Sequence, residues 1–194
     1  MFVLTLDQIG SRRDVDRVPD LLARYESADM VRSFERTVGD EVQGVTDDAA
    51  TVRVIALDTL RDGHWHIGIG SGPGRLGGTA REGSGPAFEN ARTAVEGAKS
   101  TTRFTPSIAV VGSNEGTAAE AEALLRLLGN LIESRTEAQW EAIDAHRAGE
   151  TASQIAERLN ISSEAVSQRR GYCAQTLEEA CWPLLDRLLA GTEG

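Results

Sequence analysis

The chain has 194 residues, 40% hydrophobic and 26% charged, which suits one large soluble domain or two small ones. Its net charge of −10 counts against strong binding of nucleic acid by a single copy, because such surfaces are usually basic. The sequence has neither a run of about 18 apolar residues nor the basic and apolar segments of a signal peptide. We therefore expect a cytoplasmic protein that does not enter a membrane.

Strand and helix patterns alternate over the first 70 residues. Alternating apolar residues predict strands at 2–6, 31–38, 42–45 and 65–69. Helical spacing predicts a helix at 14–26 and a second one capped by Asp47 or Asp48, with an apolar stripe of Val52, Ile55, Ala56 and Leu60. This βαββαβ order is that of a split βαβ, or ferredoxin-like, sheet.

A loop, two helices and one more strand are expected next. Residues 70–86 contain nine glycines or prolines and predict a loop. Pro86 suits the first turn of a helix that runs through 87–99, and a buried strand is expected at 107–111. A leucine-rich helix at 117–133 ends the first domain. We predict an α+β domain over 1–134 and an all-α domain over 135–194, which starts with a capping box at Thr136 and Gln139.

Two acids mark a candidate metal site in the first domain. Asp7 ends the first strand, and Asp40 follows Gly39 at a hairpin tip, which lies beside the first strand in a ferredoxin-like sheet. Two close carboxylates repel each other unless a cation lies between them, and Mg²⁺ prefers one or two carboxylates together with phosphate oxygens. Gly10 and Ser11 would offer N–H groups to those phosphates. Alternatively, Asp7 caps a helix and Asp40 is an ordinary hairpin residue.

Three strings in this domain resemble the SatD-like family of bacterial proteins and, more broadly, the palm of class III nucleotidyl cyclases. They are Asp-Gln-Ile-Gly-Ser-Arg at 7–12, Gly-Asp-Glu-Val-Gln-Gly at 39–44 and Gly-Ser-Gly-Pro-Ala-Phe at 83–88. The resemblance implies a nucleotide-type palm, with Mg²⁺ as cofactor, that is often followed by a helix-turn-helix.

The chain departs from the cyclase pattern in the helix after the Gly-rich loop. Cyclases place an Asn and, four residues later, an Arg there, where this chain has Glu89 and Thr93. Arg36 stands in the place of an adenine-reading lysine. An acid in place of a charge-stabilising group opposes phosphoryl transfer, so we expect binding rather than efficient turnover. The predicted ligand-binding residues are Gly10, Ser11, Arg36, Gly85 and Glu89.

The Gly-rich string at 81–86 opens a helix, and helix N-termini attract anions. A phosphate or carboxylate could lie there, with Arg81 or Arg75 as partner. A flexible loop with an ordinary N-cap is the alternative, because such loops are common.

The second domain has the pattern of a helix-turn-helix. Thr151 caps its second helix, Asn160 suits a left-handed turn, and Ile155, Ala156 and Val166 point inward. The third helix of such a unit reads bases near its N-terminus, where Gln can bind adenine and Arg can bind guanine. The predicted DNA-binding residues are Ser163, Ser167, Gln168, Arg169 and Arg170. A three-helix scaffold for protein contacts is the alternative.

The C-terminal tail carries an apolar stripe interrupted at Pro183. Its members are Leu177, Leu184, Leu185, Leu188 and Leu189. Such a stripe is either core or a surface that pairs two copies, and a homodimer would double the phosphate contacts to DNA. Cys173 and Cys181 lie eight residues apart in helical sequence, so we do not expect a disulfide between them.

Three functions remain open. The leading hypothesis is a dimeric DNA-binding transcriptional regulator whose degenerate cyclase-like domain senses a nucleotide with Mg²⁺ or another small ligand. The alternative is an active nucleotidyl cyclase or nucleotidyltransferase with a metal site at Asp7 and Asp40. An adaptor with neither activity is the third.

Overall fold

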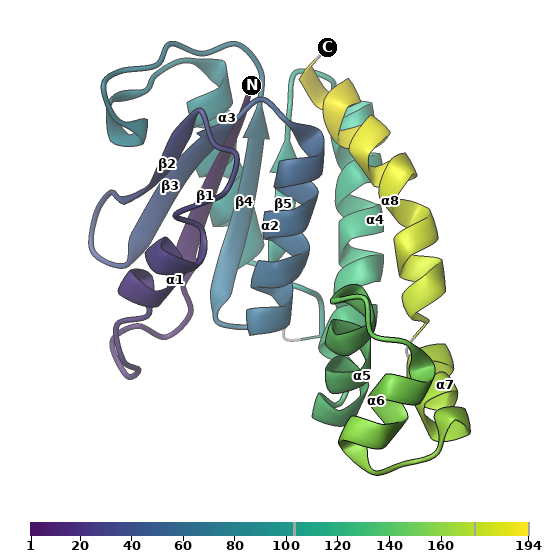
Figure 1. The fold of residues 1–194 in the computed structure, drawn as a ribbon. Helices are drawn as coiled ribbons and strands as arrows, with labels where there is room; N and C mark the ends of the chain where they lie inside the picture. Colours follow the sequence, from purple (N-terminus) through teal and green to yellow (C-terminus); the bar gives the residue numbers. More distant parts are fainter. Residues whose placement is uncertain (103, 173, 194) are drawn as a thin grey trace.

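The computed structural model describes residues 1–102, 104–172 and 174–193, so Cys173 lies outside the described residues. In this part of the chain one sheet has the strand order β2-β3-β1-β4-β5 (Figure 1). The strands are β1 (Phe2–Gln8), β2 (Arg32–Arg36), β3 (Glu41–Thr46), β4 (Trp65–Ser71) and β5 (Ile108–Val111). Strand β1 is antiparallel to β3 and β4, β2 is antiparallel to β3, and β5 is parallel to β4. The prediction of an α+β fold is confirmed.

One face of the sheet is covered by four helices, and we call it the covered face. They are α1 (Val18–Arg24), α2 (Ala49–Asp62), α4 (Glu115–Glu133) and α8 (Gln175–Ala190). Leu4, Leu6, Ile67 and Ile69 project into this layer, since alternate residues of a strand share a face. Each such buried side chain stabilises the fold by about 1.5–3 kcal/mol. This face holds the main core of the molecule.

Helix α3 (Pro86–Lys99) lies on the opposite face and covers only part of it (Figure 1). We call this face the open face. A Cβ at Gly70 would lie 2.1 Å from the backbone N of Ala91, and one at Gly68 would lie 2.4 Å from that of Val95. Helix α3 therefore rests directly on the backbone of β4. Its contact side is small, with Ala87, Ala91, Ala94 and Ala98 all buried.

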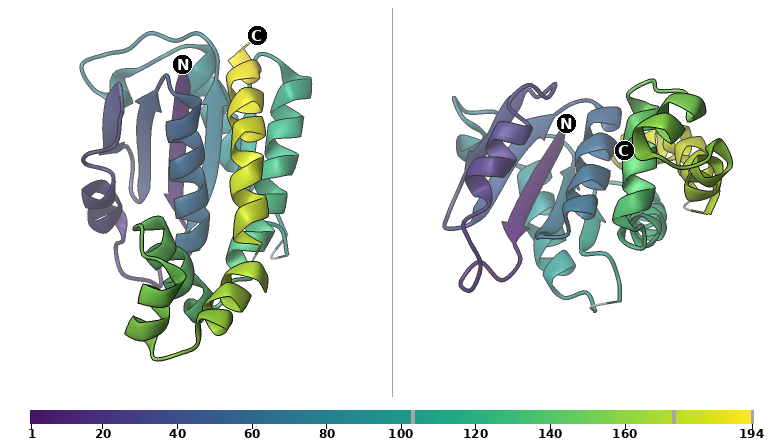
Figure 2. Two further views of the ribbon diagram at one scale, coloured as in Figure 1. Left: turned by 45° about the vertical axis from the view of Figure 1, so that its right-hand side comes forward. Right: turned by 60° about the horizontal axis from the view of Figure 1, so that its bottom comes forward.

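Three short helices lie beyond the ends of α4 and α8, at the far end of the molecule from the chain termini (Figures 1 and 2). They are α5 (Glu137–Arg147), α6 (Ala152–Leu159) and α7 (Ser163–Tyr172). Helix α8 then returns along α2 and α4, and its Leu185 and Leu189 belong to the core of the covered face. The domain boundary after Ser134 stays a prediction. None of the helices in the described ranges is long and apolar enough to cross a membrane.

Most predicted elements are present, but two are shorter than expected. Helix α1 begins at Val18 rather than Asp14, and Val15 is 67% exposed. Pro19 near its N-terminus and the bond from the N–H of Val18 to Asp16 place the helix start there. Strand β2 ends at Arg36, and Val38 is 74% exposed in the turn that Gly39 forms with a φ of +64°.

Candidate functional site

A cleft of about 600 Å³ opens on the open face, beside α3. Helix α3 lies over β4, so the neighbouring strands β1 and β3 are partly uncovered. The lining residues are Thr5, Asp7, Val38, Glu41, Gln43, Gly83, Ser84, Gly85, Phe88, Glu89, Arg92 and Glu96. Strands, the Gly-rich loop and α3 each contribute to this candidate ligand site.

Asp7 lies at the centre of a row of polar side chains that crosses three strands. Its register partners are Glu41 on β3 and His66 on β4, so the three residues project from the same face. The ammonium of Lys99 lies 3.0 Å from Oδ2 of Asp7 and 3.0 Å from Oε1 of Glu96. Burial lowers the pKa of Lys99, but hydrogen bonds to Glu96 and Asp7 outweigh it and raise that pKa overall. Lys99 therefore remains protonated and neutralises part of the row.

His66 is held in one tautomer at the edge of this row. The hydroxyl of Ser107 donates to the carbonyl of Ala98 over 2.9 Å, so it accepts from Nδ1–H of His66 over 2.6 Å. Burial lowers the pKa of His66, although the carboxylate of Asp7 opposes this effect. His66 is accordingly neutral near pH 7.

The lining of the cleft is acidic. Asp7, Glu41, Glu89 and Glu96 face it, and Arg92 is the one cation among its described lining residues. Even with Lys99 counted, negative charge is in excess. A bare triphosphate would meet repulsion in this cleft, whereas a ligand that brings positive charge would be attracted.

The predicted ligand residues of the sheet domain separate into two groups. Asp7, Gly85 and Glu89 line the cleft, whereas Asp40, Gly10, Ser11 and Arg36 are not among its described lining residues. Asp40 lies in the hairpin turn directly before Glu41, which takes the position opposite Asp7 in the sheet. The cross-strand register thus brings a glutamate, rather than the predicted aspartate, beside Asp7.

Arg36 is bound to groups outside the cleft. Its side chain pairs with Asp16 at 2.6 Å and donates to the carbonyl of Gly39 over 2.6 Å. In α3, the amide of Asn90 binds the carbonyl of Ser71 over 2.8 Å, whereas Arg92 faces the cleft. The residues nearest in sequence to the cyclase pair therefore have separate roles.

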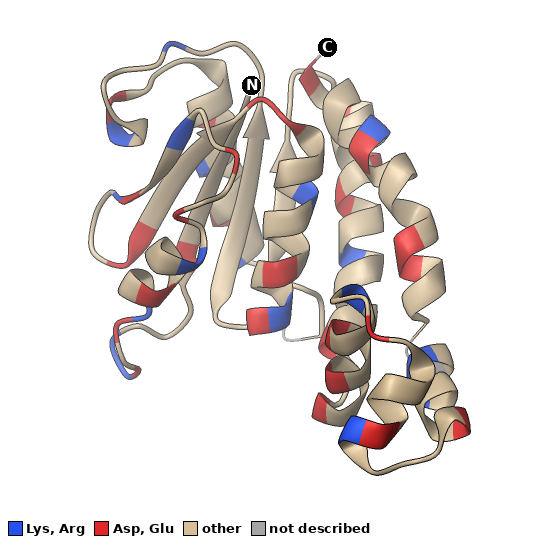
Figure 3. Cartoon of the chain, viewed as in Figure 1, with Lys and Arg blue, Asp and Glu red and all other residues tan. Residues whose placement is uncertain are grey.

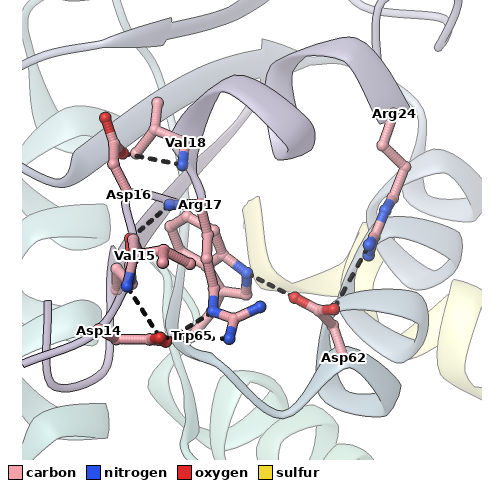
Figure 4. Close-up of polar contacts among 9 residues, drawn as sticks. Asp14, Val15, Asp16, Arg17, Val18, Arg24, Asp62 and Trp65 are labelled. Carbon is pink, nitrogen blue, oxygen red and sulfur yellow. Dashed lines mark hydrogen bonds and ion pairs between the residues drawn. The ribbon is translucent and has the colours of Figure 1, made fainter.

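The segment between β1 and α1 is held by its own hydrogen bonds (Figure 4). Gln8, 2% exposed, donates to the carbonyl of Val15 over 2.7 Å and accepts from N–H of Arg17 over 3.0 Å. Nε of Arg17 in turn donates to Asp14 over 2.7 Å, and this bond lowers the pKa of Asp14. Gly10, at a φ of +68°, accepts from N–H of Arg13 over 2.8 Å. Gly10 and Ser11 are thus part of an ordered turn.

The predicted Mg²⁺ site is not preassembled by these side chains. Lys99 already pairs with Asp7, and no group of three or more His, Cys, Asp or Glu in the described residues could hold a metal ion. A divalent cation would have to compete with this ammonium. The magnesium site stays a prediction, and no chemistry is derived through it.

Helices α6 and α7 form the second candidate site. Ile155, Ala156 and Val166 are buried between them, and Asn160 takes the left-handed conformation at φ +53°. Thr151 and Gln154 form a capping box at the start of α6, and the hydroxyl of Ser162 accepts from N–H of Ala165 at the start of α7.

The predicted DNA-binding residues lie on α7. Ser163, Ser167 and Gln168 are exposed, whereas Arg169 pairs with Glu141 at 3.7 Å and Nε of Arg170 donates to Gln175 over 2.7 Å. Acidic and basic segments lie side by side on α5–α7 (Figure 3). The exposed side of α7 is therefore polar rather than strongly basic.

Sequence reasoning missed four groups of the cleft that matter most for its charge: Glu41, Glu96, Arg92 and Lys99. Lys99 is the only lysine of the chain, which was a usable signal, but its pairing with Asp7 depends on the packing of α3. Comparison with protein-family models, curated proteins and solved structures finds no match to the chain. The geometry of the chain must therefore carry the assignment of function.

Proposed function

We propose that the protein is a ligand-responsive, DNA-binding regulator. In this proposal α6 and α7 form a helix-turn-helix, and the sheet domain is a ferredoxin-like, cyclase-type palm that holds a ligand in its cleft. The order β2-β3-β1-β4, with antiparallel neighbours and α1 and α2 on one face, supports the palm. The resemblance to the SatD-like family agrees with this combination.

The observation that carries the proposal is the geometry of α6 and α7. Two short helices pack through Ile155, Ala156 and Val166 around a left-handed Asn160. This leaves Ser163 exposed at the start of α7, and Ser167 and Gln168 exposed near its middle. A third helix presented in this way fits the major groove, where Gln168 could read adenine. The acidic balance of the chain favours two copies, because a dimer doubles the phosphate contacts.

The cleft supports a sensing role. Its acidic lining and the Lys99–Asp7 pair favour a ligand that brings positive charge, such as an organic amine or a nucleotide that arrives with its cation. A nucleotide with Mg²⁺ is the first ligand to test, and polyamines are the second.

DNA binding is tested with the full chain and sheared genomic DNA at about 50 mM salt, because electrostatic contacts are strongest at low salt. We expect fragments to be retained, and a Ser167→Ala/Gln168→Ala double variant to bind the selected fragment at least tenfold more weakly. Glu120→Ala, an exposed change on α4, is the control. If the wild-type chain retains no fragment, or the double variant binds like the wild type, the proposal is overturned.

One observation favours the enzyme alternative: Asp7 and Glu41 lie opposite each other and both line the cleft. Incubation with ATP or GTP and Mn²⁺, followed by mass spectrometry, separates the two functions. A cyclic nucleotide, or another product formed with release of pyrophosphate, would favour the enzyme if it disappears in the Asp7→Asn variant. Unchanged nucleotide would leave the cleft a binding site.

A further inference from the structure

A second cavity, of about 380 Å³, lies where α2, α4, α5 and α8 meet, away from the sheet cleft. We call it the junction cavity. Its volume is in the range of small-molecule sites. Leu57 of α2, Ile132 of α4 and the indoles of Trp140 and Trp182 give it apolar walls, and Val54, 54% exposed, lies on its lining. The cavity is thus more apolar than the cleft on the open face.

Guanidinium groups surround the two indoles. Arg61 and Arg135 lie 4.0 and 4.8 Å from the ring centre of Trp140, and Arg53 and Arg147 lie 4.7 and 5.4 Å from that of Trp182. Cation–π contacts of this kind fix both the rings and the arginines. The walls of the cavity are therefore held in place before any ligand binds.

Arg53 differs from the other arginines of the lining. Arg61 is bound at both terminal nitrogens by Asp144, at 2.8 and 2.7 Å. Arg53 donates to Asp186 through Nε alone, over 2.7 Å, and among the described residues no acceptor is found for its two terminal nitrogens. Its side chain is only 12% exposed. A guanidinium that is mostly buried, with its paired terminal N–H groups uncommitted, matches a carboxylate.

The carboxylates near the cavity are already bound. Oδ2 of Asp58 accepts from the hydroxyl of Tyr25 over 2.7 Å and lies 3.6 Å from Arg24. Glu178, 2% exposed, pairs with Arg135 at 2.6 Å and with Arg147 at 3.0 Å. The described lining residues include three arginines and these two acids, and Asp186 and Asp144 pair with Arg53 and Arg61 from outside the lining. The uncommitted terminal nitrogens of Arg53, rather than an excess of charge, therefore favour an anionic group.

We propose that the junction cavity is a binding site for a small aromatic carboxylate. The ring would contact Leu57 and the two indoles, and the carboxylate would accept from the terminal nitrogens of Arg53. Aromatic apolar walls with one fixed charged group are typical of such sites.

The position of the cavity assigns a regulatory role to this ligand, an assignment that rests on the proposed DNA binding. Trp140 and Arg147 belong to α5, the first helix of the proposed DNA-reading unit, and the Arg61–Asp144 pair joins α5 to α2. A ligand that contacts both helices favours one placement of α5 relative to the sheet layer. Occupation of the cavity would therefore change the affinity for DNA.

The binding site is tested by calorimetric titration of the full chain with 1-naphthoate and with its neutral analogue, 1-naphthalenemethanol. We expect saturable binding of one 1-naphthoate per chain, and at least tenfold weaker binding of the neutral analogue. Arg53→Gln and Arg53→Lys should each weaken 1-naphthoate at least tenfold, since lysine keeps the charge but lacks the two paired donors. Arg17→Gln is the matched control, because its Nε binds Asp14 over the same 2.7 Å distance outside the cavity (Figure 4).

Absence of saturable binding to the wild type, or equal binding by the wild type and both Arg53 variants, overturns the site. If neither Arg53 variant folds, Val54→Trp decides, because this exposed change should fill the cavity and abolish binding. If Val54→Trp then binds 1-naphthoate as tightly as the wild type, the proposed site is overturned.

The regulatory role is tested by titrating the selected DNA fragment with and without saturating 1-naphthoate. We expect a change of at least threefold in the dissociation constant, and an unchanged constant overturns regulation. The two proposals fail separately. DNA binding without 1-naphthoate binding rejects the cavity site, whereas 1-naphthoate binding without DNA binding rejects the regulator.

Discussion

The two faces of the sheet are covered by different means. On the covered face, large side chains such as Leu6 and Ile69 meet helices that also carry large apolar residues, and the layer is closed by α8. On the open face, Gly68 and Gly70 meet the alanines of α3, so the helix lies at backbone contact with β4. Close contact over β4 leaves the polar side of β1 and β3 uncovered. The cleft is thus a consequence of small residues in the neighbouring strand.

The largest expected effect concerns the closure of the covered face by α8. Glu178→Ala should lower the free energy of unfolding by about 3–5 kcal/mol, because it removes the buried carboxylate that pairs with the guanidinium of Arg135, 1% exposed, at 2.6 Å. Urea unfolding measures this loss. Glu179→Ala, next in the chain and 31% exposed, should cost no more than about 1 kcal/mol. Equal losses in the two variants would mean that α8 does not depend on the buried pair.

The second effect tests the close contact on the open face. Gly70→Ala should cost about 1–3 kcal/mol, since its Cβ would lie 2.1 Å from the backbone of α3 and the helix would have to move. Gly97→Ala, on α3 itself, is the control, because a Cβ there would lie 3.6 Å from its nearest neighbour, Cβ of Ala109. This change should stabilise the folded protein by about 0.5–1 kcal/mol. Both values come from urea unfolding. A neutral Gly70→Ala would show that α3 is not seated on the strand.

A third effect tests the charge balance of the cleft. Lys99→Met removes the ammonium that pairs with Asp7 and Glu96, so the affinity for Mn²⁺ should rise about fivefold, or about 1 kcal/mol. Calorimetric titration with MnCl₂ measures it. Asp7→Asn in the Lys99→Met background should reverse the gain. An affinity that is the same with and without Lys99 would show that the ammonium does not compete for this site.

The smallest effect depends on pH. The pKa of His66 is lowered by burial, so the unfolded chain takes up a proton more readily, and stability falls as the pH drops below about 6.5. His66→Gln should reduce the loss of unfolding free energy between pH 7.5 and 5.5. Between pH 7.5 and 8.5, above this window, both proteins should behave alike. If the wild type and the His66→Gln variant lose the same unfolding free energy on acidification, His66 is not the source of the loss.

Local patterns predicted the elements well where one face of an element is apolar and its ends carry their own signals. The stripe from Val52 to Leu60 forms the buried side of α2, and Asp48 caps that helix through the N–H groups of Ala50 and Thr51. The capping box at Thr136, the cap at Thr151 and the left-handed Asn160 are present as predicted. These features depend on neighbours within four residues, which the sequence shows directly.

The site was harder to predict because its members come from distant segments. The sequence placed Asp7 at a strand end, but the cross-strand register decided that Glu41 and His66 would flank it. Lys99 reaches Asp7 only because α3 lies close over β4. The start of α1 was also mispredicted, because Val15 is exposed and lies before the helix. Pro19 and the hydrogen bonds of Gln8 set the helix start and override the apolar spacing.

The sequence by itself determined the order of strands and helices, their caps and their apolar sides, since these follow from backbone geometry and the spacing of side chains along the chain. Tertiary structure alone decided which charges meet in the cleft, and that α8 returns to cover the sheet while its neighbours α5–α7 stay beyond it. Such contacts depend on strand register and on the distance of closest approach between elements. Both are set by the packing of all the elements together.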